Sequence, residues 1–164
     1  MSEENRVVEV MVEIPTGSQN KYEFDKEKGV FKLDRVLFSP MHYPTEYGYI
    51  EDTLALDGDP LDVLVYTSFP TFPGCVIDSR VIGMLNMSDE KGQDEKLLAV
   101  PTEDPRFKDV HSLDDMPKHV LDEIAHFFKV YKDLENKETN IGDWEGPERA
   151  AKVIDESLKR YKDQ

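Results

Sequence analysis

Short strand-like segments fill the first hundred residues of this chain, and helical spacing of apolar residues begins only after Pro101. Residues 6–14 alternate between apolar and polar side chains, which is the pattern of a half-buried strand. Further strands are expected at 21–24, 30–33, 62–67, 76–87 and 96–100, with turns at 15–20 and at 28–29. Residues 36–50 are rich in aromatic side chains, and we expect them to be irregular.

Two helices are expected after the strands. The first spans about 117–134, because Asp115 is placed to cap it and Pro117 suits a first turn. Its apolar side chains recur at helical spacing, and they are Val120, Ile124, Phe127, Phe128 and Tyr131. The second helix starts near Pro147, and its expected apolar face is formed by Ala150, Ile154, Leu158 and Tyr161. The polar segment 135–143 between them is expected to be a mobile loop.

Strands followed by helices favour an α+β, mainly β fold, in which a small barrel carries the helices on one side. The absence of strand–helix alternation argues against a doubly wound sheet. A length of 164 residues suits one core, so residues 1–164 are expected to form one domain. The sequence shows no apolar run of membrane-spanning length and no signal pattern, and Cys75 is the single cysteine. We therefore expect a cytoplasmic protein with no membrane partner.

The segment DGDPLD at residues 57–62 places three carboxylates directly ahead of an expected strand. A tight turn at Gly58 would aim Asp57 and Asp62 inward together and leave Asp59 offset for a different task. A second acidic pair, Asp89 and Asp94, lies on a turn between two other strands. Two such turns facing each other would form a cage of oxygen ligands, which selects Mg²⁺, Mn²⁺ or Ca²⁺ over zinc or copper. The alternative is a pair of acidic turns that only terminate strands.

Four cations lie among apolar or aromatic neighbours: Lys21, Arg35, Lys96 and Lys132. Taken singly, each of these residues can be interpreted as a surface cation whose aliphatic part is buried. Beside a carboxylate cage they indicate a polyanionic substrate, because Arg offers phosphate a bidentate fork and Lys a point charge. Three tyrosines are candidate phenolic donors in the same region, although aromatic core packing is an equal alternative for Tyr43 and Tyr49. The candidate donors are Tyr43, Tyr47 and Tyr131.

Composition and missing motifs exclude several function classes. A net charge of −15 opposes nonspecific nucleic-acid binding, which depends on Lys and Arg. The four histidines form no zinc-hydrolase pattern, and neither a P-loop nor a dinucleotide-binding glycine motif is present. Cys75 has no evident activating partner, and serine-hydrolase signatures are absent.

The segment from Asp57 to Val63 resembles the signature of the soluble family I inorganic pyrophosphatases, and the resemblance covers nearly the whole chain. Further matches follow in the family's order: Glu13-Ile14-Pro15, Lys21-Tyr22-Glu23, Asp34-Arg35, Tyr43-Pro44, Tyr47-Gly48-Tyr49, Asp89-Glu90, Asp94-x-Lys96, and His126-Phe127-Phe128 through Tyr131-Lys132-Asp133-Leu134. The resemblance implies a five-stranded OB-type barrel with flanking C-terminal helices. It also implies hydrolysis of pyrophosphate to two phosphates, through attack by a water or hydroxide that bridges metal ions, in a homohexamer of prokaryotic type.

The resemblance also implies the metal ligands, by position in this chain. Asp57, Asp62 and Asp94 would bind the tightest metal, and Asp62 would bridge two metals. Asp89 and Asp94 would hold a metal that arrives with the substrate. Glu13 and Glu23 would act at the rim on metal-bound waters. We expect several Mg²⁺ ions per subunit, with Mn²⁺ as a possible substitute and Ca²⁺ as an inhibitor.

The remaining roles follow from the same resemblance. The residues expected to hold the phosphate groups are Lys21, Arg35, Tyr47, Lys96, Tyr131 and Lys132. Asp59 would accept the proton of the attacking water, with Asp94 as the rival for that role. The alternatives left open are a metal-binding module without activity, an oligonucleotide-binding barrel, and a hydrolase of another phosphoanhydride.

Overall fold

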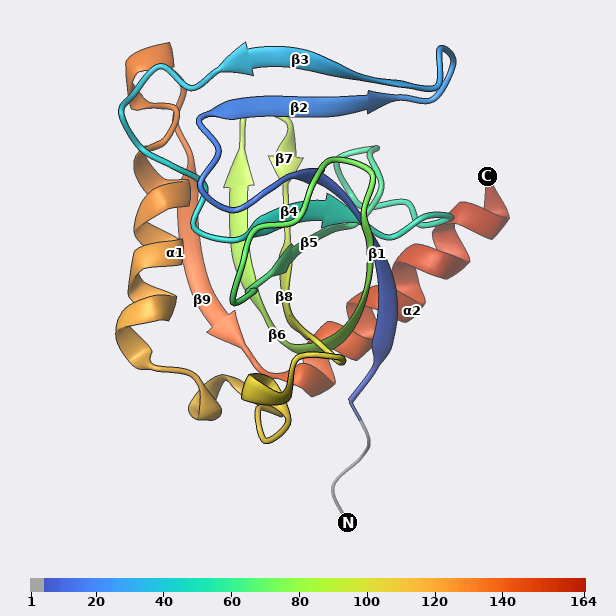
Figure 1. Cartoon of the computed structure of the whole chain (residues 1–164). Coiled ribbons are helices and arrows are strands. Elements are labelled where there is room, and N and C mark those ends of the chain that lie inside the picture. Colours follow the sequence, from blue (N-terminus) through green and yellow to red (C-terminus); the bar gives the residue numbers. More distant parts are fainter. Residues whose placement is uncertain (1–4) are drawn as a thin grey trace.

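The computed structural model describes residues 5–164, and its first hundred described residues are built mainly of strands (Figure 1). The strands are β1 Val7–Ile14, β2 Asn20–Asp25, β3 Val30–Val36, β4 Glu46–Tyr49, β5 Asp62–Val65, β6 Val76–Asp89, β7 Gly92–Gln93, β8 Lys96–Pro101 and β9 Asn140–Glu145. The helices are α1 Lys118–Val130 and α2 Pro147–Asp163, with 3₁₀ turns at Pro105–Phe107, Leu113–Asp115 and Asp133–Glu135.

Five strands close into a ring in the order β1-β4-β5-β8-β6, because β1 pairs with both β4 and β6. The β5–β8 pair is parallel and the other four pairs are antiparallel. This ring with two C-terminal helices confirms the predicted five-stranded, OB-type barrel. Closure brings β1 and β4 very near each other, since a Cβ on Gly48 would lie 2.1 Å from the carbonyl oxygen of Met11. Glycine is therefore required at this crossing.

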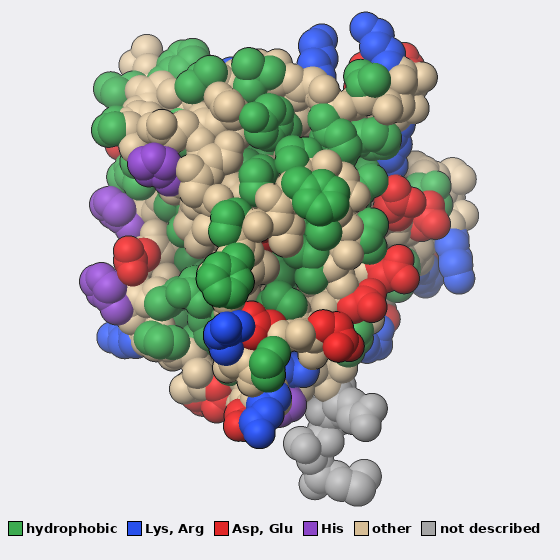
Figure 2. Space-filling model, in the orientation of Figure 1, with side chains coloured by type: hydrophobic (Ala, Val, Ile, Leu, Met, Phe, Trp, Pro, Cys, Tyr) green, Lys and Arg blue, Asp and Glu red, His purple; other side chains and the backbone are tan. Residues whose placement is uncertain are grey.

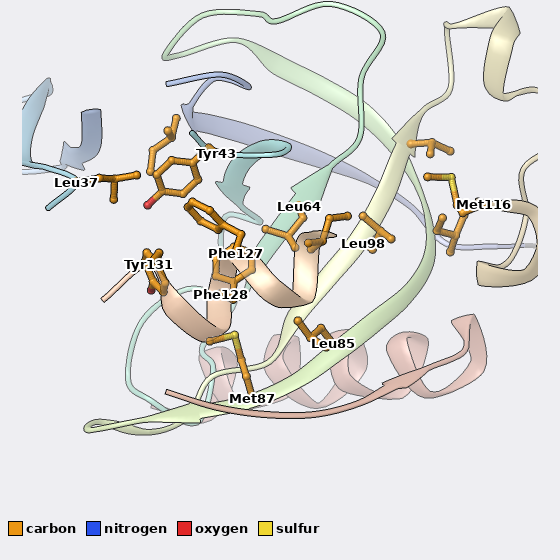
Figure 3. Packing of buried hydrophobic residues seen from close by; sticks show 14 residues of the cluster. Leu37, Tyr43, Leu64, Leu85, Met87, Leu98, Met116, Phe127, Phe128 and Tyr131 are labelled. Atoms are coloured by element: carbon orange, nitrogen blue, oxygen red, sulfur yellow. The ribbon is translucent and has the colours of Figure 1, made fainter. Parts of the chain in front are cut away.

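Both faces of the central strands are buried, which explains their nearly continuous apolar sequence. In β5, Val63 and Val65 belong to the cluster that packs on α2, whereas Leu64 belongs to the cluster that packs on α1. Strand β8 alternates in the same way. Figure 3 shows the cluster on α1, where Phe127 and Phe128 pack beside Leu64 and Leu98. The two helices thus hold opposite faces of the same barrel wall.

The structure corrects several predicted elements. Residues 46–49 form β4 rather than irregular chain, and 140–143 belong to β9 rather than a loop. Both strands are short or polar, so they form through pairing with β5 and β6 rather than through a pattern of their own. Helix α1 ends at Val130, earlier than predicted, and a 3₁₀ turn follows. No helix within residues 5–164 is long and apolar enough to cross a membrane.

Helix α2 begins at the predicted proline, and three of the four residues predicted on its apolar face pack against the barrel: Ala150, Ile154 and Leu158. Its buried side chains are Ala150, Val153, Ile154 and Ser157. Tyr161, predicted on the apolar face, is 37% exposed, because the last turns of α2 extend past the barrel (Figure 1).

The β2–β3 hairpin lies across one end of the barrel (Figure 1). It forms a separate two-stranded sheet and contacts the barrel through β1. Its strands are half-exposed, with polar side chains such as Lys21 and Arg35 opposite each other. Side chains of the hairpin and of the barrel end line one cavity.

Candidate active site

A cavity of about 480 Å³ lies between the hairpin and the turns at the barrel end. Every catalytic, metal-binding and substrate-binding residue predicted from the family resemblance lines it, although together they span residues 13–132. They are Glu13, Lys21, Glu23, Arg35, Tyr47, Asp57, Asp59, Asp62, Asp89, Asp94, Lys96, Tyr131 and Lys132. The cavity therefore brings acidic turns and cationic strands, separate in the sequence, into one place.

The acidic turn after β4 is held by its own backbone. Gly58 has a φ of 90°, which an L side chain rarely adopts, so the predicted tight turn at this glycine is present. The carboxylate of Asp57 accepts the Asp59 N–H at 3.1 Å, and the Asp59 carbonyl accepts the Ala55 N–H at 2.7 Å. The turn thereby fixes Asp57 while the Asp59 side chain remains 61% exposed.

Lys96 occupies the centre of the acidic wall. The parallel register of β5 and β8 pairs Asp62 with Lys96, and the Lys96 Nζ lies 2.7 Å from Asp62 Oδ2 and 3.0 Å from Asp94 Oδ2. It also lies 2.6 Å from the Tyr47 hydroxyl, which donates to Asp62 Oδ2 at 2.9 Å. Burial alone would lower the pKa of Lys96, but Asp62 and its other partners raise that pKa well above its ordinary value. Lys96 therefore stays charged and holds both carboxylates.

Three carboxyl groups at this site have raised pKa values. Burial raises the pKa of Glu13 to about 7, and the nearby charge of Asp62 adds to the effect. Burial likewise raises the pKa of Asp94 to about 6, again with help from Asp62. The pKa of Asp57 is raised, chiefly by burial. Burial therefore makes these three carboxyl groups harder to ionise than exposed ones.

The donor set fits a hard divalent cation, since every acidic ligand in the cavity offers carboxylate oxygen. The side chains are nevertheless not drawn into a finished coordination shell. In residues 5–164, no three His, Cys, Asp or Glu side chains converge closely enough to hold a metal ion. The ammonium of Lys96 instead spans the gap between Asp62 and Asp94.

The opposite wall is cationic and is organised by carboxylates. Lys21 and Arg35 are cross-strand partners in the hairpin. Asp34 accepts from both of them, at 3.2 Å from Lys21 Nζ and 2.5 Å from Arg35 Nη1. On the other side, Lys132 Nζ lies 3.5 Å from Asp89 Oδ2. These ion pairs keep the cations at the edge of the acidic wall.

Some lining residues had no role predicted from the sequence: Tyr22, Phe24, Lys26, Asp34, Tyr49, Pro60, Glu90, Lys91 and Lys137. Asp34 and Glu90 are each adjacent in the sequence to a predicted site residue, and this adjacency is the sequence feature from which their place in the cavity could have been predicted. Tyr49 lines the cavity although it is only 4% exposed, and its hydroxyl has no hydrogen-bond partner among the described residues. Tyr43 instead packs in the core, as the alternative interpretation held.

Glu46 is a further buried carboxylate that the sequence did not single out. It is fully buried, and its oxygens accept the backbone N–H groups of Thr16 and Thr71 and the Thr71 hydroxyl. It therefore joins two loops beside the barrel rather than lining the cavity.

In this small closed barrel, carboxylates and the lysine and arginine side chains that commonly bind phosphate surround one cavity. This combination is typical of a metal-dependent enzyme that acts on a small polyanion. The chain belongs to the inorganic pyrophosphatase family, whose model matches residues 10–162. It is 72% identical over 162 residues to the inorganic pyrophosphatase of Halalkalibacterium halodurans, covering 99% of each chain. It is 68% identical to that of Geobacillus stearothermophilus, covering 100% of this chain and 99% of the relative.

Solved structures agree with this assignment. The crystal structure of inorganic pyrophosphatase from Thermus thermophilus superposes with a TM-score of 0.93 at 44% identity, covering 95% of this chain and 91% of that one. The Helicobacter pylori inorganic pyrophosphatase also gives 0.93, at 43% identity and 99% coverage of both chains. The family resemblance seen in the motifs is therefore confirmed.

Proposed function

We propose that this protein is a Mg²⁺-dependent enzyme that hydrolyses inorganic pyrophosphate to two orthophosphates. The observation that carries the proposal is the single cavity in which an acidic wall faces a cationic wall. A carboxylate wall alone would repel pyrophosphate, and a cationic wall alone would bind it without a means of activating water. The family membership supports the same reaction.

The cationic wall would hold the substrate. Arg35 offers a planar guanidinium, and Lys21 and Lys132 offer ammonium groups that approach the cavity from two different sides. Tyr131 and Tyr47 add phenolic hydroxyls at the same cavity. Lys96 differs from the other cations, because its side chain is only 2% exposed and its ammonium already contacts Asp62, Asp94 and the Tyr47 hydroxyl. Its main task would be to hold Asp62 and Asp94 in place.

The acidic wall would hold the metal ions, which we propose to be several Mg²⁺. Asp57, Asp62, Asp89 and Asp94 are the proposed ligands, with Glu13 and Glu23 at the rim. When bound, Mg²⁺ supplies two things: positive charge against the phosphates and a lowered pKa for the attacking water. Burial raises the pKa values of Asp57, Asp94 and Glu13, with neighbouring carboxylates adding to the effect, and a divalent cation would favour their charged forms.

We propose Asp59 as the group that accepts the proton of the attacking water. Its side chain is 61% exposed at the cavity, and the nearest cation, Lys91 Nζ, lies 3.9 Å from its Oδ2. Asp94 is the less suitable acceptor, because both its oxygens lie close to Lys96 Nζ. The chemical step then requires positioning and charge stabilisation rather than a covalent intermediate with the protein.

We further propose a single-domain, cytoplasmic protein that assembles as a homohexamer. Several large apolar side chains are exposed, and they include Val30, Leu33, Val36, Phe38, Phe69, Phe72 and Val76. Figure 2 shows hydrophobic side chains gathered over one face of the molecule. Such a face is typical of a surface that another copy covers. Light scattering during gel filtration would measure the assembly directly, and a monomer at micromolar concentration would reject it.

The reaction is tested by following substrates by ³¹P NMR in the presence of Mg²⁺. We expect pyrophosphate to yield orthophosphate as the sole product, and tripolyphosphate and ATP to react far more slowly. Faster hydrolysis of ATP or tripolyphosphate would assign the site to another phosphoanhydride. If calorimetry shows Mg²⁺ binding but pyrophosphate, tripolyphosphate and ATP are not hydrolysed, the protein is a metal-binding module without this activity.

A further inference from the structure

We propose that Glu135 is a positioning residue for Arg35: its buried carboxylate holds the guanidinium from behind and ties the hairpin to the segment that carries Tyr131 and Lys132. This inference rests on the proposed function, since it assigns Arg35 to the substrate. Glu135 itself is absent from the lining of the cavity. Any effect of Glu135 on the reaction must therefore pass through the residues that it touches.

The contact between these two residues is close and nearly dry. Arg35 Nε lies 2.9 Å from Glu135 Oε1, and the Glu135 side chain is only 4% exposed. The N–H direction is not aligned on this oxygen, so the contact is an ion pair rather than a hydrogen bond. Glu135 Oε2 is also buried and has no partner among the described residues. A buried carboxylate with so few partners depends strongly on the one cation beside it.

Arg35 is thus placed by two carboxylates and keeps most of its donors. Among the described residues the only hydrogen bond of its guanidinium runs from Nη1 to Asp34. A guanidinium carries five N–H donors; one on Nη1 is bonded to Asp34 and the Nε–H is buried against Glu135, which leaves the three other N–H groups for phosphate oxygens. Asp34 and Glu135 together offset the effect of burial, and they raise the pKa of Arg35 above its ordinary value. The two acids therefore fix the position and charge of Arg35 while leaving terminal N–H groups of its guanidinium for the substrate.

The segment from Tyr131 to Lys137 is a compact turn, so the contact between Glu135 and Arg35 also fixes Arg35 relative to Lys132. The backbone N–H groups of Glu135 and Lys137 both donate to the Lys132 carbonyl, at 3.0 and 3.3 Å. Asn136 has a φ of 58°, which reverses the chain after the 3₁₀ turn. Glu135 therefore sits on the same rigid turn as Lys132.

The other end of this turn is tied to the β6–β7 turn. Lys132 Nζ lies 3.5 Å from Asp89 Oδ2, and Lys137 Nζ lies 3.8 Å from Glu90 Oε1. The turn thus bridges two walls of the cavity, and Glu135 makes its ion pair with the hairpin. Loss of the Glu135 charge would leave Arg35 free to shift relative to Lys132.

The test is steady-state hydrolysis of pyrophosphate by Glu135→Gln in the full-length protein with Mg²⁺. We expect KM to rise about tenfold while kcat changes less than about threefold, the size of effect for one weakened charged contact with substrate. The competitive inhibition constant of inorganic phosphate should rise in parallel. Glu138→Gln, which removes the same charge from an exposed site three residues away, is the matched control and should match the unaltered protein.

A double-mutant cycle separates this role from a general loss of structure. In an Arg35→Gln background, Glu135→Gln should change KM less than about twofold, because the residue through which it acts is gone. An equal rise in KM in both backgrounds, or an unchanged KM in Glu135→Gln, would overturn the proposal. If Glu135→Gln does not fold, Glu135→Asp replaces it: an intermediate rise in KM is expected, and an unchanged KM overturns the proposal.

Failure of the proposed function would look different. It would show as no phosphate release by the unaltered protein under any of these conditions. Calorimetric binding of pyrophosphate would then replace kinetics as the readout for Glu135. Weaker binding by Glu135→Gln than by Glu138→Gln would support the positioning role, and equal binding would overturn it.

Discussion

Lys96 Nζ lies 2.7 Å from Asp62 Oδ2 at the point where the paired strands β5 and β8 both begin. The Lys96 side chain is 2% exposed and that of Asp62 is 16% exposed. The parallel register of two barrel strands therefore creates a nearly dry ion pair at the base of the cavity. Because Asp94 shares the same ammonium, one lysine holds residues from both acidic turns.

Lys96→Met should destabilise the protein in the absence of metal. The substitution leaves two buried carboxylates without their cation, and breaking a buried ion pair costs about 3–5 kcal/mol in the free energy of unfolding. Urea unfolding at pH 8 with a chelator measures this loss. Lys118→Met, at an exposed position at the start of α1, is the control and should lie within about 0.5 kcal/mol of the unaltered protein. Equal urea midpoints of unfolding for the two variants would show that Lys96 does not stabilise the protein in this way.

The raised pKa of Glu13 predicts a pH dependence of stability. The folded state binds this proton more tightly than the unfolded state, with a pKa of about 7 against 4.5. Its contribution is therefore fully present below pH 4.5 and is lost as pH rises through about 7. Glu13→Gln keeps an acceptor for the Phe24 N–H, which now bonds Glu13 at 2.9 Å, and removes the charge.

Unfolding of the metal-free protein and of Glu13→Gln should be compared between pH 4.5 and 8. We expect the free energy of unfolding of the unaltered protein to fall relative to the variant by on the order of 1–3 kcal/mol across this range. Added Mg²⁺ should reduce the difference at high pH. A difference that does not vary with pH would contradict the raised pKa.

Asp59→Asn should lower kcat by roughly 10²–10⁴-fold, the usual contribution of a general base. Because the Asp59 side chain is exposed and makes no buried contact, the melting temperature should not change. Asp109→Asn, a surface aspartate outside the cavity, serves as the control. A kcat within threefold of the control would transfer the role of proton acceptor to Asp94.

Arg35→Lys should not behave as a conservative change. Lysine keeps the charge but loses the planar fork, and it cannot reach Asp34 and Glu135 in the same geometry. We expect kcat/KM for pyrophosphate to fall by roughly 10–100-fold, as for loss of a charged hydrogen bond of about 1.5–3 kcal/mol. Arg106→Lys, on the exposed Pro105–Phe107 turn, should have no effect. Unchanged kinetics in Arg35→Lys would remove Arg35 from the substrate site.

The strands, the acidic turn and the cations among apolar neighbours were predictable from local signals, whereas the five-stranded barrel and the rest of the cavity lining were predicted from the family resemblance. Alternation along β1 and the apolar runs of β5 and β8 mark strands that are buried, and Asp57 to Asp62 form a turn whose Gly58 requires a positive φ. These signals lie within a few residues of each other in the sequence.

The features that escaped prediction depend on distant partners. Strand β9 is polar, and it forms because Ile141 and Trp144 pair with β6 some fifty residues earlier. The contact between Arg35 and Glu135 joins residues one hundred positions apart, and nothing near either residue indicates the other. The position of Lys96 between two acids likewise required the β5–β8 register. Long-range pairing therefore sets the details of the site.

Phosphate release from pyrophosphate, measured with Mg²⁺ and again with a chelator, tests most directly whether the acidic wall recruits cations for the substrate. We predict rapid release of two orthophosphates per pyrophosphate with Mg²⁺, partial activity with Mn²⁺, and loss of activity with chelator or with Ca²⁺. Equal release in the presence of chelator would contradict the role of the acidic wall, and no release with any ion would contradict the proposed reaction.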